Sequence, residues 1–204
     1  MNLTFKGKTA IVTGASGGIG GAIALKLASQ GASVGVHYNA TKSNAEKICE
    51  DVRVAGGSAM PIHADVTDVS QVNRMFDDLD SEYGSVDILV NNAGINKDGL
   101  LIRMSDSDWD EVILVNLKGA FLCSRAAAKV MLKKRWGRII TISSIVGLVG
   151  NIGQAHIKCS FNNIIMTGFI ITQYIFFRKS LQLTGFNRPT KCLLKSLTFK
   201  ITYF

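Results

Sequence analysis

Short runs of apolar residues, many of them β-branched, alternate along the first 155 residues with longer segments in which apolar side chains recur at helical spacing. The short runs predict buried strands, and the longer segments predict amphipathic helices. Regular alternation of the two favours right-handed crossovers and a parallel sheet with helices on both faces. We therefore expect a doubly wound α/β fold with five parallel strands, at residues 9–13, 33–38, 59–63, 86–90 and 138–143.

Glycines and breaks in the periodicity indicate where the helices end. Three helices are expected, each followed by a glycine that acts as a stop signal, at residues 19–30, 43–55 and 69–83. The run 105–134 is too long for one ordinary helix with a single packed face. Asn116 and Gly119 indicate an interruption within it.

The composition changes abruptly after Ala155. Residues 1–155 hold all 15 acidic residues and 16 of the 23 basic ones, whereas residues 156–204 hold no Asp, Glu, Ala or Val but seven of the ten Phe. We expect one domain over 1–155, followed by a basic, Phe/Ile-rich tail at 156–204 that is not an independent domain. Since seven of the eight net positive charges lie in this tail, the basic balance gives no argument for a nucleic-acid partner.

The cysteines and the first residues bear on the compartment. Cys49, Cys123, Cys159 and Cys192 are far apart in sequence and have no histidines at metal-ligand spacing, so we expect neither a metal site nor a disulfide framework. Free thiols suit a reducing compartment, and we expect a cytoplasmic location. The first predicted strand follows Met1 too soon for a secretion signal.

A glycine-rich turn joins the first predicted strand to the first predicted helix. Glycine lets the backbone turn sharply and approach a pyrophosphate, whose charge is then bound by helix N-terminal amides. The alternative is a tight loop without a ligand. The position of the turn between strand and helix favours a dinucleotide site, with the candidate residues Thr13, Gly14, Ser16, Gly18, Ile19 and Gly20.

Polar residues follow three further strands, at the carboxyl edge where open α/β sheets bind ligands. They are Asp65 and Val66 after the third strand, Asn91, Asn92, Ala93 and Gly94 after the fourth, and Ser143 and Ser144 after the fifth. The aspartate is a candidate partner of an adenine amino group, or alternatively starts a helix. The asparagine segment is a candidate for the same site, or alternatively a simple turn.

Together these segments make a pattern of five motifs: Thr13-Gly-x-x-x-Gly-x-Gly20, Asp65-Val66, Asn91-Asn-Ala-Gly94, Asn116 and Ile142-Ser-Ser-Ile-Val-Gly147. The pattern resembles the short-chain dehydrogenase/reductase family. Residues 98–104 and 150–155 look most like the 3-oxoacyl-[acyl-carrier-protein] reductases within that family. The resemblance covers about the first three quarters of the chain, and it implies a Rossmann-like NAD(P)-binding domain.

The resemblance implies a role for each candidate residue. The glycine turn would hold the cofactor pyrophosphate, Asp65 would meet the adenine, and residues 91–94 would line the cofactor site. Asn116 would hold a water in a proton relay, and Ser144 would hydrogen-bond the carbonyl of a 3-oxoacyl substrate, either small or linked to acyl carrier protein. The implied cofactor is NADPH, with NADH as the alternative. The family also implies a homo-oligomer.

The chain departs from the family pattern at the catalytic pair. In the family, a tyrosine thirteen residues after the serine acts as general acid, and a lysine four residues later assists it. Ile157 and Phe161 stand at these positions, and neither can donate a proton or carry a charge. The sequence therefore leaves three hypotheses: an NAD(P)H-dependent reductase, a catalytically inactive NAD(P)-binding remnant, and a product that misfolds.

Residues near the end of the second strand bear on the choice of cofactor. NAD-preferring folds usually place an acid there for the ribose hydroxyls. Here His37, Tyr38 and Asn39 stand at that end, with Lys42 nearby, so a 2′-phosphate meets no repulsion. Gly17 occupies the place of an arginine in many NADP-using relatives, which removes a phosphate contact. We expect a modest preference for NADPH.

The tail is expected to replace the last strands of the family and the helix that bears its tyrosine and lysine. The fifth strand would then be an unpaired edge. Residues 164–177 are uncharged but too short to span a bilayer comfortably, and their composition is typical of aggregation-prone segments. Our hypothesis is that the tail is out-of-frame or intron-derived sequence fused to a truncated reductase.

Overall fold

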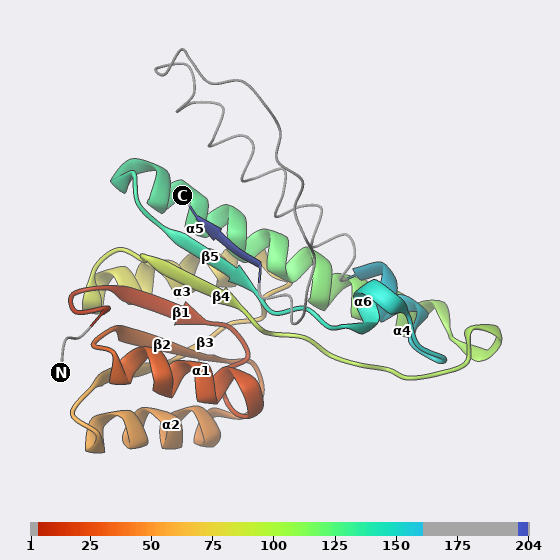
Figure 1. Cartoon of the computed structure of the whole chain (residues 1–204), viewed down its shortest axis with the longest axis horizontal. Coiled ribbons are helices and arrows are strands. Elements are labelled where there is room, and N and C mark those ends of the chain that lie inside the picture. The colour runs from red at the N-terminus through yellow and green to blue at the C-terminus, as the bar shows by residue number, and fades with distance from the viewer. Residues whose placement is uncertain (1–3, 161–199, 204) are drawn as a thin grey trace, which may run out of the picture.

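The computed structural model describes residues 4–160 and 200–203. Its sheet has six strands in the order β3-β2-β1-β4-β5-β6, and the first five along the chain are parallel (Figure 1). The five predicted strands are confirmed as β1 (Thr9–Val12), β2 (Ser33–Tyr38), β3 (Ser58–His63), β4 (Ile88–Asn91) and β5 (Arg138–Thr141).

Helices cover both faces of this sheet (Figure 1). One face packs against α1 (Gly18–Ser29) and α2 (Lys42–Val54), and the other packs against α3 (Val69–Tyr83) and α5 (Ala120–Lys134). Side chains alternate along β1, so Ala10 and Val12 join the first core and Ile11 joins the second. The Rossmann-like α/β fold and the three helices expected between residues 19 and 83 are confirmed, each helix within one residue of its predicted ends.

The long run expected to be interrupted consists of three pieces. α4 (Asp106–Val112) continues into a π-helical segment, η2 (Ile113–Gly119), and then into α5. Asn116 lies in the π-helical segment, and a Cβ added to Gly119 would lie 2.8 Å from a methyl group of Val66. The predicted interruption is confirmed. The wider turn lets the helix approach the segment after β3 without a side chain in between.

The tail contributes a sixth strand. β6 (Lys200–Tyr203) pairs antiparallel with β5, from Tyr203 opposite Arg138 to Lys200 opposite Thr141. The expectation that β5 would be an unpaired edge is therefore wrong. The open backbone N–H and C=O groups of an edge strand accept a short β-prone segment in either direction. The predictions for Phe161 and residues 164–177 concern residues outside the described ranges.

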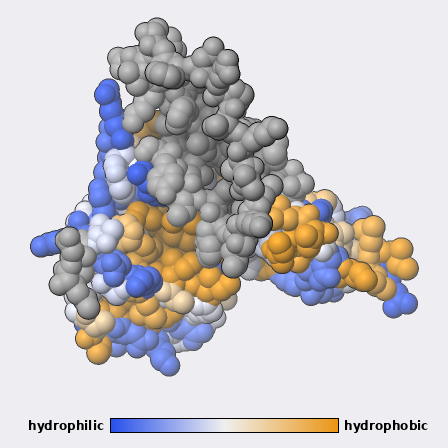
Figure 2. Space-filling view, in the orientation of Figure 1, coloured by the Kyte–Doolittle hydropathy of each residue, from blue (hydrophilic) through white to orange (hydrophobic). Residues whose placement is uncertain are grey.

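An arm extends beyond the carboxyl ends of the strands and carries α4, the 3₁₀ helix η1 (Leu101–Arg103) and α6 (Val146–Val149) (Figure 1). The backbone N–H of Gly99 donates to the carbonyl of Gly153 at 2.9 Å, which joins the loop after β4 to the loop after β5. Apolar side chains are exposed on this arm, where Figure 2 shows hydrophobic surface: Leu100, Leu101, Ile102, Ile145, Leu148, Val149 and Ile152.

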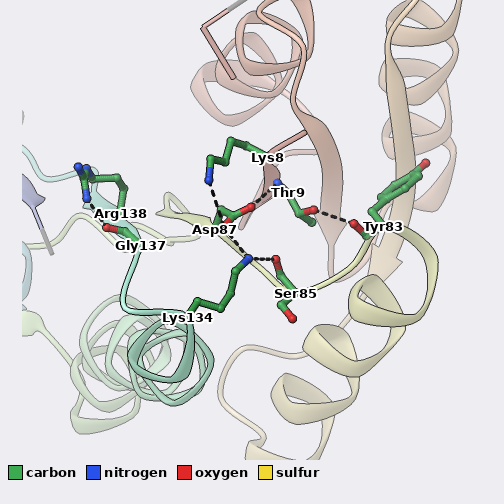
Figure 3. A network of polar contacts seen from close by, with 8 residues as sticks. All are labelled: Lys8, Thr9, Tyr83, Ser85, Asp87, Lys134, Gly137 and Arg138. Carbon is green, nitrogen blue, oxygen red and sulfur yellow. Dashed lines mark hydrogen bonds and ion pairs between the residues drawn. The ribbon is translucent and has the colours of Figure 1, made fainter. Parts of the chain in front are cut away.

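A buried carboxylate organises the opposite, amino edge of the sheet (Figure 3). Asp87 is 3% exposed and precedes β4. One of its carboxylate oxygens accepts a hydrogen bond from the backbone N–H of Thr9 at 3.1 Å, and the other accepts from the Lys134 ammonium at 2.5 Å. The Lys8 ammonium lies 3.8 Å from that second oxygen. Asp87 therefore joins the start of β1, the start of β4 and the end of α5.

We expect Asp87→Asn to lower the free energy of unfolding by about 2 kcal/mol, because a buried carboxylate with charged donors is worth more than a neutral amide. Urea unfolding followed by circular dichroism measures this change. The matched control is Asp78→Asn, an exposed carboxylate on α3, for which we expect a change within about 0.5 kcal/mol. Equal stability of the two variants would contradict the role given to Asp87.

Candidate functional site

Two strand ends meet where the order of the sheet reverses, between β1 and β4. Open α/β sheets bind ligands at such a point. The hydroxyl of Thr13 accepts hydrogen bonds from the backbone N–H groups of Asn92 and Ala93, at 2.9 and 3.0 Å. The side-chain amide of Asn92 in turn donates to the carbonyl oxygens of Thr13 and Gly14, each at 3.0 Å. Two of the predicted site segments are therefore joined directly.

Gly14 and Gly20 are required by this junction. Gly14 has a φ of +61°, and a Cβ added to it would lie 2.8 Å from the Cα of Ala93. A Cβ on Gly20 would collide with the side-chain amide of Asn92 and with the carbonyl oxygen of Gly14. The sequence reasoning attributed these glycines to the approach of a pyrophosphate. In the structure, both also allow the turn to pack against residues 92–93.

The start of α1 is exposed and has no side-chain cap. The helix begins at Gly18, and Gly17 at the N-cap position has no side chain that could accept from the first amides. Gly17, Gly18 and Ile19 are exposed, and nothing lies within 4 Å of a Cβ added to either glycine. Uncapped N–H groups and the positive end of the helix dipole attract an anion. This helix end therefore has the features of an anion site, and Ser16 lies just before it.

His37 links the turn to the neighbouring strands, a role that the sequence reasoning missed. Its ring is 2% exposed. Nδ1 accepts from the backbone N–H of Gly14 and Nε2 donates to the carbonyl of Ala64, both at 2.9 Å. Burial lowers the pKa of the imidazole below its ordinary value. No sequence signal distinguishes this histidine from another polar residue in a strand.

Asp65 lies after β3 and directly follows Ala64, whose carbonyl oxygen accepts from His37. One carboxylate oxygen accepts from the backbone N–H of Thr67 at 2.8 Å and from its hydroxyl at 2.7 Å, so this oxygen is engaged within a local turn. The helix-start alternative for Asp65 is wrong, because the N-cap of α3 is Asp68, which accepts from the N–H groups of Ser70 and Gln71. Val66 beside it is buried against α5 and the π-helical segment.

Asn91 and Asn116 use their amides inside the protein. Asn91 is 4% exposed and donates to the Ser124 hydroxyl at 2.9 Å, which joins β4 to α5. The Asn116 amide accepts from the N–H of Ile95 at 2.8 Å and donates to its carbonyl at 2.9 Å. A Cβ added to Gly94 would lie 3.2 Å from the amide oxygen of Asn116. Asn91 therefore connects β4 to α5, and Asn116 fixes the chain after β4 at Ile95.

The two serines after β5 lie at the same edge of the sheet. The Ser144 hydroxyl accepts from the backbone N–H of Val146 at 3.2 Å, at the start of α6. The Ser143 hydroxyl is buried and has no hydrogen-bond partner within residues 4–160 and 200–203. The structure therefore brings the segments after β1, β4 and β5 to one edge, as the strand order requires.

No proton donor stands at the two positions where the resemblance expects a tyrosine and a lysine. Ile157 is 5% exposed and apolar. The neighbouring His156 is fully buried, and its Nε2 donates to the backbone carbonyl of Lys97 at 2.8 Å. Phe161 lies outside the described residues. A buried imidazole that is already bound to a carbonyl does not replace an accessible general acid.

Known proteins share this sequence pattern. The short chain dehydrogenase family matches residues 8–160, and the chain belongs to this family. It is 49% identical over 149 residues to a 3-oxoacyl-[acyl-carrier-protein] reductase FabG of Staphylococcus aureus, covering 73% of this chain and 61% of that protein. It is 47% identical over 154 residues to the FabG of Salmonella typhimurium, covering 76% and 62%. The chain therefore spans about three fifths of the length of these relatives, and the predicted resemblance is confirmed.

The described residues also bear on membrane and metal binding. Within residues 4–160 and 200–203, no helix combines the length and the apolar character needed to cross a bilayer. The same residues contain no group of three or more His, Cys, Asp or Glu side chains that could hold a metal ion.

We expect Gly14→Ala to lower the free energy of unfolding by about 2–3 kcal/mol, since the new methyl group would meet backbone atoms at a left-handed φ. Gly17→Ala is the matched control in the same turn. Its φ of 165° suits any residue and its Cβ meets no atom, so we expect a change within about 0.5 kcal/mol. Urea unfolding compares the two, and a tolerated Gly14→Ala would contradict the packing role.

Proposed function

We propose that this chain is an NAD(P)H-dependent oxidoreductase resembling the 3-oxoacyl-[acyl-carrier-protein] reductases, and that it binds its dinucleotide at the carboxyl edge of β1 and β4. The observation that carries the proposal is the junction of Thr13 with residues 92–93 beside the uncapped start of α1. This arrangement offers free N–H groups to a pyrophosphate and has an opening at Gly17 and Gly18. The bound dinucleotide would supply the hydride.

The proposed cofactor is NADPH. The end of β2 has no acidic side chain that would repel a 2′-phosphate, and Asn39 there is exposed. Lys42 at the start of α2 is exposed and lies 3.3 Å from Glu46, which partly offsets its charge. His37 is buried, so its side chain offers no exposed charge at this end of β2. These features support a modest preference for NADPH over NADH, with phosphate contacts weaker than an arginine would supply.

The proposed substrate is a 3-oxoacyl thioester, small or linked to acyl carrier protein. This part of the proposal rests on the names of the FabG relatives, whose length the chain covers to 61–62%. Ser144 is the proposed hydrogen-bond donor to the substrate carbonyl. Asn116 is the residue proposed to bind a relay water. Because its side-chain amide is bound to the backbone of Ile95, the Asn116 backbone would make the contact with this water.

A second candidate function is dinucleotide binding without reductase turnover. It is favoured by the apolar, buried Ile157 at the position of the family tyrosine. Reduction of a ketone needs a proton for the developing alkoxide, and general acid catalysis typically contributes about 10²–10⁴-fold in rate. The two candidates share the dinucleotide site and differ only in turnover.

The cysteines are consistent with action in a reducing cytoplasm, which we propose as the location. The three cysteines among the described residues are free thiols. Burial raises the pKa of Cys49 to about 11 and that of Cys123 to about 12, so both stay protonated and unreactive at neutral pH. The relatives of this chain lead us to propose self-association as well, which sedimentation would measure.

We expect calorimetry to find tighter binding of NADPH than of NADH, by a few-fold. Gly17→Arg should increase the affinity for NADPH about tenfold and leave that for NADH nearly unchanged, because a guanidinium can bind a 2′-phosphate in bidentate geometry. The site tolerates the substitution, since its φ of 165° suits any residue. Gly17→Ala serves as the control. Tighter binding of NADH by the unmodified chain would contradict the NADPH proposal.

We expect NADPH oxidation with a 3-oxoacyl thioester to be at least about 10²-fold slower than for an intact relative, because the general acid is absent. Ile157→Tyr with Phe161→Lys should not restore turnover, since two correct side chains need a packed helix to meet the substrate. A chimera of residues 1–155 with the C-terminal part of a relative should restore it. Substantial turnover by the unmodified chain would exclude the second candidate function.

A further inference from the structure

His37 is a buried titratable group that connects three segments at the proposed dinucleotide site. Its ring accepts from the N–H of Gly14, in the glycine-rich turn, and donates to the carbonyl of Ala64, at the end of β3. Its own backbone carbonyl accepts from the N–H of Ala15 at 2.8 Å. Ala64 directly precedes Asp65. One side chain therefore ties the turn to the segment proposed to meet the adenine.

The two ring contacts define the protonation state of His37. A backbone N–H can only donate and a carbonyl oxygen can only accept, so Nδ1 carries no proton and Nε2 carries one. The ring is therefore neutral in this arrangement. An imidazolium would direct a second N–H at the N–H of Gly14, and two donors would face each other at 2.9 Å.

The surroundings favour the neutral ring. Burial lowers the pKa of His37, the charge of His63 lowers it further, and the Ala64 carbonyl and Asp65 oppose this decrease. His63 and Asp65 both lie at the end of β3, whereas the turn at residues 13–17 contains no acidic or basic side chain. Protonation therefore requires acid below the ordinary histidine pKa of about 6.5.

The turn cannot shift freely if the Gly14 contact is lost. A Cβ on Gly14 would lie 2.8 Å from the Cα of Ala93, so the backbones are in close contact. The carbonyl of Gly14 also accepts from the amide of Asn92. A displacement of Gly14 away from an imidazolium therefore disturbs both the turn that precedes α1 and the segment after β4.

We propose that neutral His37 is a positioning residue that holds the glycine-rich turn in its dinucleotide-binding shape, and that binding weakens when the ring gains a proton. The inference rests on the proposed dinucleotide binding and assigns a pH dependence to that site. His37 does not contact the dinucleotide in this proposal. It acts through Gly14 on one side and through Ala64 on the other.

Calorimetric titration of the full chain with NADP⁺ and with NAD⁺, from pH 7.5 to pH 5.5, tests the inference. His37→Asn is the informative variant, because its amide oxygen can accept from Gly14 but does not titrate. His63→Asn is the matched control, since it removes an exposed histidine from the neighbouring strand. A phosphate monoester loses its second proton near pH 6, so the comparison between variants cancels the titration of the NADP⁺ phosphate itself.

We expect the affinity of the unmodified chain to fall further over this range than that of His37→Asn, by up to about tenfold, since the His37 pKa lies below its ordinary value. The affinity of His63→Asn should fall at least as far as that of the unmodified chain, because the charge of His63 is one cause that lowers the His37 pKa. A role in folding alone would not move the pH profile in this way. Equal pH profiles for the unmodified chain and His37→Asn would overturn the inference and leave the proposed function intact. Absence of binding by all variants at pH 7.5 would overturn both.

Stability measured over the same range separates binding from unfolding. Because the folded-state pKa of His37 is lowered, its contribution to stability is complete above about pH 6.5 and is lost as the pH falls through the folded-state value. The unmodified chain should therefore lose more stability in urea at pH 5.5 than His37→Asn does, while remaining folded without urea. Loss of binding that merely follows global unfolding by circular dichroism would overturn the inference.

Discussion

Strand β1 pairs in parallel with β4, and this pairing brings together residues that are distant in sequence. The N–H of Asn92 reaches the hydroxyl of Thr13 across 79 positions. Without this pairing the sheet order would not reverse beside β1, and the start of α1 would face no second strand end. The β1–β4 pairing therefore positions the glycine-rich turn, the segment after β4 and the arm beyond them. A change that loosens it therefore affects the site even when no site residue is replaced.

Buried polar groups fix the two ends of this pairing, and apolar side chains fill the space between them. Asp87 connects the amino ends of β1 and β4, and Thr13 with Asn92 connects their carboxyl ends. The residues between, such as Ile11 and Leu89, are fully buried and paired in register. Apolar packing is tolerant of small sliding movements, whereas hydrogen bonds have strict geometry. The polar groups at each end therefore define the register within which the apolar core packs.

The alternation of strands and helices was predictable because hydrophobic periodicity is a local signal, and the five parallel strands and three of the helices follow it closely. The glycine turn and residues 91–94 were recognisable because their spacing is distinctive. His37 and Asp87 were not, since a single polar residue in or beside a strand has no pattern, and its partners come from distant segments. β6 was missed because edge pairing depends on what the neighbouring strand leaves open. Whether Ser144 and Asn116 act as the resemblance implies stays a prediction.

The long separation between Thr13 and Asn92 also has a consequence for synthesis. Ribosomes add about 5–20 residues per second, so on the order of ten seconds pass between these two residues. During that time β1 can pair with β2. The N–H groups that donate to the Thr13 hydroxyl have not yet been synthesised, and neither has Ala93, against which Gly14 packs. The first motif to leave the ribosome is thus completed only after the fourth strand appears. An emerging chain of this protein therefore has most of its first core before it has the proposed dinucleotide site.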